Sequence, residues 1–167
     1  MAASMPSYVK YVNTLRAALP ADVQKTMEQY EAKGDYEAPE YQQIIMTQLY
    51  AKHICRLDPW PEPVMRAMRF ANQQVYNTMQ GPSEFTVTGN IKNWDRWNDL
   101  HRIDVPTLLI GSRYGTMSAD DIQKMGSLMP QARVAICENG SHLAMYDDQE
   151  AYFNALVPFL RERRRKT

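Results

Sequence analysis

A single histidine stands in a tight Gly-Ser turn that directly follows a strand-like apolar run. The chain from Arg133 to Met145 reads Arg-Val-Ala-Ile-Cys-Glu-Asn-Gly-Ser-His-Leu-Ala-Met, which places His142 at the tip of the turn. A general base often occupies such a position, because imidazole exchanges protons near neutral pH. On spacing alone, a lone histidine after a strand is more often a turn or packing residue. His142 is therefore a candidate base, with packing as the alternative.

The partners that such a base needs are missing from the sequence. The segment 112–116, which follows the preceding strand-like run, reads Ser-Arg-Tyr-Gly-Thr and contains no carboxylate to orient an imidazole. The motif Gly-x-Ser-x-Gly, which presents a nucleophilic serine, occurs nowhere in the chain. Asp120, Asp121 and Glu138 are nearby carboxylates that could substitute for the acid. The two aspartates are equally explained as residues at a helix start, where exposed N–H groups favour negative charge.

The charge of the chain is balanced, with 19 basic and 19 acidic residues among 167 and a formal net charge of zero. This balance favours small or peptide ligands over nucleic acid or an anionic membrane. The basic run 161–166 is typical of a helix end in solvent, where cations interact with the last carbonyls. No two of His53, His101 and His142 have ligand spacing, so we expect neither a metal nor a cofactor.

The expected compartment is the cytoplasm. Cys55 and Cys137 lie in apolar surroundings and far apart in sequence, which indicates buried thiols in a reducing environment rather than a disulfide framework. The first residues lack the basic and apolar regions of a signal peptide. No apolar run approaches the roughly 20 residues that span a bilayer, so no membrane partner is expected.

The first half of the chain has the apolar spacing of helices. Pro20, Gly34 and the prolines near residue 60 interrupt the pattern and mark where helices end. One further helix follows those prolines. We therefore predict helices over about 4–19, 21–34, 39–53 and 64–76.

The second half alternates between strand and helix patterns. Residues 106–111 form a short, continuous apolar run that ends in glycine, typical of a parallel strand buried on both faces. A helix is predicted from about 118 to 129, a second strand over 134–137 and a final helix over 152–160. This order is a βαβ unit followed by a helix, in which the two strands are parallel neighbours.

Two parallel strands do not make a finished sheet, because both edges would expose unpaired backbone groups. The run 108–110 is apolar on both faces, so at least one further strand is expected beside it. Residues 85–88 alternate weakly and could form a short strand or an extended connection, but one such segment does not complete an α/β sheet. We therefore predict an incomplete sheet.

The segment 84–160 resembles the C-terminal part of the proline iminopeptidases, α/β-hydrolase aminopeptidases that include the tricorn-interacting aminopeptidase. The matching stretches are Glu-Phe-Thr-Val-Thr-Gly at 84–89, Trp-Asp at 94–95, Ile-Asp-Val-Pro-Thr-Leu at 103–108 and Gly-Ser-His-Leu-Ala-Met at 140–145. Residues 1–12 are similar to the point where the family's chain enters a helical cap. The resemblance implies an α/β protein with a helical cap at 1–93, followed at 94–167 by the last βαβα unit of an α/β-hydrolase core with an incomplete sheet.

The same resemblance implies roles for individual residues. His142 becomes the triad base, which takes the proton of a nucleophilic serine and later delivers it to the leaving amine. Glu84 matches a cap glutamate that binds the substrate's free α-amino group, a task that suits a carboxylate in a partly desolvated pocket. Gly115 stands at the position of the triad aspartate, and Thr116 at that of a second amine-binding glutamate. Loss of the orienting carboxylate costs comparable triads on the order of 10⁴-fold in turnover.

The resemblance thus implies a serine aminopeptidase or amidase that releases N-terminal proline or hydrolyses related amides. The chain alone is predicted to be inactive, because nucleophile and triad acid are missing. The expected partners are a peptide or amide with a free N-terminal amine, a complementary N-terminal hydrolase half, or a second copy bound through the sheet edge. The alternative is a non-catalytic binding or interaction protein derived from an α/β-hydrolase.

Overall fold

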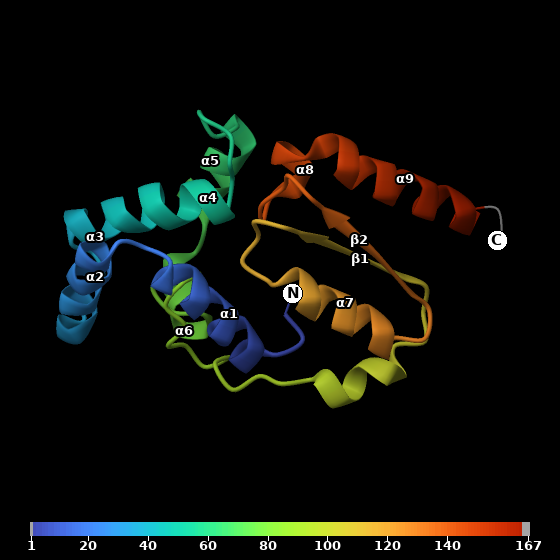
Figure 1. Cartoon of the computed structure of the whole chain (residues 1–167), viewed down its shortest axis with the longest axis horizontal. Coiled ribbons are helices and arrows are strands. Elements are labelled where there is room, and N and C mark those ends of the chain that lie inside the picture. The colour runs from blue at the N-terminus through green and yellow to red at the C-terminus, as the bar shows by residue number, and fades with distance from the viewer. Residues whose placement is uncertain (1, 165–167) are drawn as a thin grey trace.

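The computed structural model describes residues 2–164. Helices α1 to α6 gather on one side of the molecule, and a two-stranded sheet with α7 and α9 forms the other (Figure 1). Residue 1 and residues 165–167 lie outside the described residues. These are the outer ends of the two predicted domains, and the second range includes the end of the basic run. None of the helices within 2–164 combines the length and apolar character that crossing a bilayer requires.

The first two helices begin and end at the residues that the sequence indicates. Helix α1, Met5–Ala17, starts after Ser4, whose side chain accepts a hydrogen bond from the Ser7 amide at 3.3 Å. Helix α2, Ala21–Lys33, ends at Gly34, which adopts a left-handed φ of 67°. Both predicted helices are confirmed. Their ends could be predicted because a capping side chain and a glycine at the C-terminus are local signals in the sequence.

The third predicted helix is also confirmed, as a continuous helical stretch. It consists of α3 (Pro39–Ile44), η1 (Ile45–Tyr50) and α4 (Ala51–His53). The prediction of one helix over 64–76 is wrong, because two helices, α5 (Glu62–Phe70) and α6 (Gln73–Met79), occupy this region. The chain is extended at Ala71, and the Asn72 side chain then caps α6 by accepting from the Val75 amide at 3.1 Å.

The helical part has its own hydrophobic core. Its most deeply buried side chains come from α1, α2, α3, η1 and the segment after α6: Val12, Met27, Tyr41, Leu49 and Phe85. The segment after α6 forms an isolated antiparallel bridge between Ser83 and Thr86 and contributes no strand to the sheet. The 85–88 segment is therefore a connection that begins in a turn and is anchored to the core by Phe85, and it is not a strand of the sheet.

The sheet consists of two parallel strands, β1 (Thr107–Ser112) and β2 (Ala132–Cys137), paired in register from Thr107 with Ala132 to Ser112 with Cys137. Helix α7, Ala119–Leu128, connects them and covers one face, while α9, Gln149–Arg164, covers the other (Figure 1). The βαβ unit and the final helix are thereby confirmed. The short helices η2 (Trp97–Arg102) and α8 (Ala144–Asp147) precede β1 and α9.

One edge of β1 has no strand beside it within residues 2–164. A cavity of about 510 Å³ follows this edge, and its walls include Ile122 of α7 and Leu156 of α9. Leu108, Leu109 and Ile110 are only partly covered there. Apolar strand residues flanked by helices on both faces are typical of the interior of an α/β sheet, so the sheet is incomplete, as predicted.

Candidate active site

Glu84 lies in a connection that is tied to three helices. Arg16 of α1 donates to the Phe85 carbonyl at 3.1 Å and forms an ion pair with Glu31 of α2 at 2.8 Å. The Thr86 hydroxyl lies 3.1 Å from the Tyr41 hydroxyl of α3. These partly buried contacts on either side of Glu84 fix its backbone against the predicted cap.

Three tyrosines surround the Glu84 side chain and backbone. Tyr8 of α1 and Tyr76 of α6 donate to the carboxylate at 2.7 and 2.8 Å, and the Glu84 amide donates to the Tyr50 hydroxyl at 3.2 Å. Burial, followed by the negative charge of Glu84, raises the pKa of both Tyr8 and Tyr76. Both phenols therefore remain protonated donors, and the carboxylate keeps further lone pairs for a cationic ligand.

Gly81 gives the Glu84 connection its turn. Its φ is 128°, and a Cβ at this position would stand 2.8 Å from the Thr88 amide nitrogen. We expect Gly81→Ala to lower the free energy of unfolding by at least about 2 kcal/mol, because side chains avoid this backbone region and the neighbouring backbone cannot yield. Gly34→Ala is the matched control, since its φ is 67° and nothing lies within 4 Å. Gly34→Ala should lower the free energy of unfolding by only about 1 kcal/mol. Urea unfolding measures both, and equal losses would contradict this account.

The loop that carries His142 is clamped by backbone and side-chain bonds. The amides of His142 and Leu143 each donate at 2.9 Å, to the carbonyls of His53 and Ile54 at the end of α4. The Ser112 hydroxyl at the end of β1 donates to the Ser141 carbonyl at 2.6 Å. The histidine loop is thus held between the sheet and the helical part.

The His142 ring has one polar side-chain neighbour that is fully buried. Nδ1 lies 3.2 Å from the Thr116 hydroxyl oxygen. The ring borders open cavities and so keeps exposed surface, yet the protein packed around it lowers the pKa of His142, and the charge of Glu84 partly opposes that shift. A neutral imidazole with an accessible ring can accept a proton, as a general base must.

Gly115 lies beside the histidine loop. A Cβ on Gly115 would be 3.7 Å from the His142 amide nitrogen and 2.7 Å from the Ser112 hydroxyl. No carboxylate within the described residues hydrogen-bonds His142 directly. Gly115 is placed where a side chain could approach His142, and its assignment as the vacant acid position stays a prediction.

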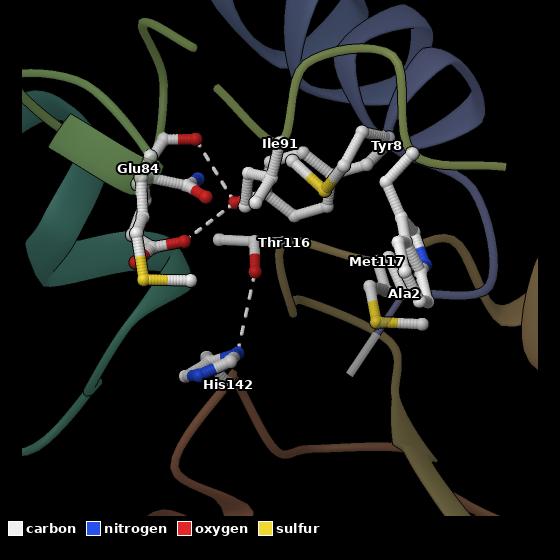
Figure 2. Close-up of a pocket in the computed structure, with 11 residues that line it drawn as sticks. Ala2, Tyr8, Glu84, Ile91, Thr116, Met117 and His142 are labelled. Atoms are coloured by element: carbon white, nitrogen blue, oxygen red, sulfur yellow. Dashed lines mark hydrogen bonds between the residues drawn. The ribbon is translucent and has the colours of Figure 1, made fainter. Parts of the chain in front are cut away.

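Glu84 and His142 line the same cavity, which measures about 400 Å³. Figure 2 shows Tyr8 bonded to Glu84, and Thr116 directly above His142, with Ile91 and Met117 also on the wall. The lining is predominantly apolar. A carboxylate and an imidazole therefore face one cavity that suits a small apolar group carrying a positive charge.

The other carboxylates that were considered as substitute acids lie elsewhere. Both oxygens of Glu138 accept from Arg113 at 2.9 Å on the surface. Asp121 stands in the first turn of α7, where its amide donates to the Ser118 cap at 3.0 Å, and Asp120 lies beside it. Among the described residues, none of these three carboxylates forms a hydrogen bond with His142. Residues 2–164 also contain no cluster of three or more histidine, cysteine, aspartate or glutamate side chains that could hold a metal ion.

Sequence reasoning missed the side chains that connect the site. No functional role was assigned from the sequence to Tyr8, Tyr50 and Tyr76, which all contact Glu84. Thr116 was interpreted as a replaced glutamate, and its hydroxyl contacts the His142 ring. No local signal could have found these contacts, because all but that of Tyr76 join residues that lie far apart in the sequence.

No protein-family model matches the chain. Curated relatives do match it: a proline iminopeptidase of Flavobacterium johnsoniae is 39% identical over 163 residues, and one of Elizabethkingia meningoseptica is 40% identical over 164 residues. Each alignment covers 97% of this chain and 55% of the relative. The chain therefore spans about half the length of the curated relatives it matches.

Solved structures give the same result. The crystal structure of VinJ matches with a TM-score of 0.90 and 31% identity, over 96% of this chain and 55% of that one. The crystal structure of proline iminopeptidase from Mycobacterium smegmatis matches with a TM-score of 0.83 and 28% identity, over 96% and 54%. These comparisons confirm a partial α/β-hydrolase fold. The division into domains at residues 93 and 94 stays a prediction.

Proposed function

The chain corresponds to the C-terminal part of the proline iminopeptidases, and from this premise we propose that it supplies the cap and the general base of a proline-iminopeptidase-like serine hydrolase. The reaction is the release of N-terminal proline from a peptide, or the hydrolysis of a related amide. His142 is the base and Glu84 binds the substrate amine. The nucleophilic serine belongs to a complementary N-terminal half.

The observation that carries the proposal is the shared cavity of Glu84 and His142. A substrate ammonium that pairs with Glu84 would place the adjoining carbonyl toward His142, because only the α-carbon separates the two groups in an N-terminal residue. The apolar wall, which includes Met5 and Ile91, suits a pyrrolidine ring. A carboxylate at this point restricts cleavage to the first residue, since an internal peptide nitrogen carries no charge.

In this reaction the chain provides proton transfer and substrate placement. His142 takes the proton of the attacking hydroxyl and returns it to the leaving amine as the acyl-enzyme forms. The lowered pKa of His142 keeps the ring neutral near pH 7, the state that accepts a proton. The clamp on the histidine loop through the His53 and Ile54 carbonyls holds the ring in place without a direct carboxylate.

The free edge of β1 supports the need for a complementary half. Helices α7 and α9 lie on either side of this edge, and the partly covered strand β1 lines the cavity between them. A further parallel strand there would pair the backbone of β1 and cover Leu108 and Ile110. The N-terminal half of the family is the proposed source of that strand, and of the nucleophile.

The test is reconstitution with the N-terminal half of the Flavobacterium johnsoniae relative, co-expressed with this chain. We expect no hydrolysis of L-proline p-nitroanilide by the chain alone and measurable hydrolysis by the complex. His142→Ala in the complex should abolish turnover, while His101→Ala, an exposed histidine of η2, should not. Turnover by the isolated chain that depends on His142 would refute its inactivity. A stable complex without turnover would refute the catalytic proposal.

The second candidate function is a non-catalytic binding or interaction protein. Gly115, which leaves His142 without a carboxylate partner, favours this alternative. The same cavity would then hold a small amine or peptide through Glu84, or the β1 edge would pair with a second copy. Light scattering tests the second form, and a monomer at all concentrations would exclude it.

A cytoplasmic location is part of the proposal. Cys55 and Cys137 are both buried and unpaired. Burial raises the pKa of the Cys137 thiol to about 11, so it stays protonated and unreactive at neutral pH. Unpaired buried thiols fit a reducing compartment.

A further inference from the structure

The side chain of His53, at the end of α4, contacts the loop that follows β1. Its Nδ1 lies 2.8 Å from the Tyr114 carbonyl oxygen. A carbonyl oxygen can only accept, so the ring carries its hydrogen on Nδ1 and donates it to Tyr114. Burial lowers the pKa of His53, and the bond to the Tyr114 carbonyl opposes part of that shift. Because Nδ1 carries a hydrogen in both the neutral and the protonated ring, this bond persists when His53 titrates.

The main chain of His53 holds the other loop of the candidate site. Its carbonyl accepts from the His142 amide at 2.9 Å. The two loops are also bonded to each other, because the Tyr114 amide donates to the Gly140 carbonyl at 3.0 Å. These hydrogen bonds form a closed circuit, from Tyr114 to Gly140, from His142 to the His53 carbonyl, and from the His53 ring back to Tyr114. The bond from the His53 ring is the part of this circuit that depends on a side chain.

The circuit fixes the separation between the loop after β1 and the histidine loop. Thr116 follows Tyr114 in the first of these loops and is fully buried, and its hydroxyl lies 3.2 Å from His142 Nδ1. Arg56 adds a second contact from the end of α4, because its guanidinium lies over the Tyr114 ring, 3.8 Å from the ring centroid. The loop that presents Thr116 is thus bonded to the same residue, His53, that anchors the loop of His142.

We propose that His53 is a positioning residue, whose ring holds the loop after β1 so that the Thr116 hydroxyl stays against the His142 ring. The inference rests on the proposed role of His142 as general base, and it adds a side chain of the predicted cap to the catalytic arrangement. Transfer of a proton depends on the alignment of the base, and a displacement of about 1 Å can cost on the order of 10²-fold in rate. His53 acts on the base through Tyr114 and Thr116, not by contact with the substrate.

Amide hydrogen exchange of the complete chain tests the circuit. His53→Leu removes the donor and keeps an apolar side chain against Phe85, whose ring centroid lies 5.9 Å from that of His53. His53→Asn keeps an N–H donor at the δ position. We expect the amides of Tyr114 and His142 to exchange about three- to tenfold faster in His53→Leu, and at the original rate in His53→Asn. The Val12 amide in α1 should not change, whereas a loss of global stability would accelerate all three amides alike.

The ¹⁵N spectrum of the His142 ring tests the path through Thr116. Thr116→Val should change the Nδ1 shift of His142, and this change should fall by about half or more when His53→Leu is already present, because the hydroxyl is then displaced. His101→Leu, at an exposed histidine of η2, should leave the effect of Thr116→Val intact. Equal effects with and without His53→Leu would overturn the proposal, as would exchange rates in His53→Asn that match those in His53→Leu.

In the reconstituted complex, His53→Leu is expected to lower kcat by about tenfold and to leave KM within about twofold. The reason for this split is that the hydrogen bonds of Glu84 go to tyrosines and not to His53. A rise in KM at unchanged kcat would contradict the proposed role of His53. The exchange and ring measurements need no turnover, so this inference and the hydrolase proposal can fail separately.

Discussion

In a complex reconstituted with the N-terminal hydrolase half, Gly115→Asp is expected to raise the kcat for L-proline p-nitroanilide by about 10²-fold. A side chain on Gly115 starts 3.7 Å from the His142 amide, so a carboxylate there can replace the Thr116 hydroxyl at Nδ1. A carboxylate at Nδ1 stabilises the imidazolium by its charge, which the neutral Thr116 hydroxyl does not have. Parallel kcat measurements on the two complexes give the ratio.

The size of this gain also reports on the starting tautomer. Triads that lose the acid and adopt the wrong tautomer lose on the order of 10⁴-fold in turnover, so a gain that large would mean that His142 adopts the wrong tautomer in the unmodified chain. Gly115→Asn is the control of equal size without charge, and equal rates for Asn and Asp would rule out an acid role at this position.

One steric point must be controlled in that experiment. The added Cβ would lie 2.7 Å from the Ser112 hydroxyl, which now donates to the Ser141 carbonyl. The hydroxyl must rotate away, at the expense of one bond to the histidine loop. The double variant Ser112→Ala, Gly115→Asp removes the overlap, so a gain seen only in the double variant would assign the limitation to this contact.

Glu84→Gln is expected to weaken the binding of L-prolinamide to the isolated chain by about 30-fold or more. The substitution keeps the size of the side chain and removes the charge, which leaves a partly desolvated ammonium without its partner. Isothermal calorimetry measures the two dissociation constants. The prediction holds for the hydrolase and for the amine-binding form of the second candidate, because both use the same amine site.

Two controls define the origin of that loss. N-acetyl-L-prolinamide has no basic amine and should not distinguish the two chains. Glu138→Gln, a surface carboxylate paired with Arg113, should bind L-prolinamide as the unmodified chain does. No heat with the unmodified chain, or an unchanged affinity in Glu84→Gln, would remove Glu84 from the amine site.

The elements of the fold that depend on local patterns were predictable from the sequence. The run 106–111 and the apolar segment 134–137 have the composition of buried parallel strands, and they form β1 and β2. The break between α5 and α6 was not predicted, because the apolar spacing continues across it. An extended Ala71 and the cap at Asn72 override that spacing.

The arrangement of the site could be predicted only in part. The resemblance singled out Glu84 and His142, and the structure places both on one cavity. Glu84 bonds to Tyr8 from α1, and His142 contacts Thr116 from the loop after β1, and only the packing of the helical part on the sheet brings these side chains to one cavity. Hydroxyl groups have no spacing rule, so composition gave no sign of them.

The anchoring of the histidine loop by the His53 and Ile54 carbonyls has a consequence for timing. Because the loop of His142 is bonded to the end of α4, a movement of the predicted cap that shifts α4 would also shift the imidazole of His142. Entry of a peptide and proton transfer by His142 would then require two different positions of the predicted cap. A cross-link that fixes the predicted cap in the closed position should therefore keep His142 aligned but prevent a peptide from entering. The open form should admit a peptide but not react with it.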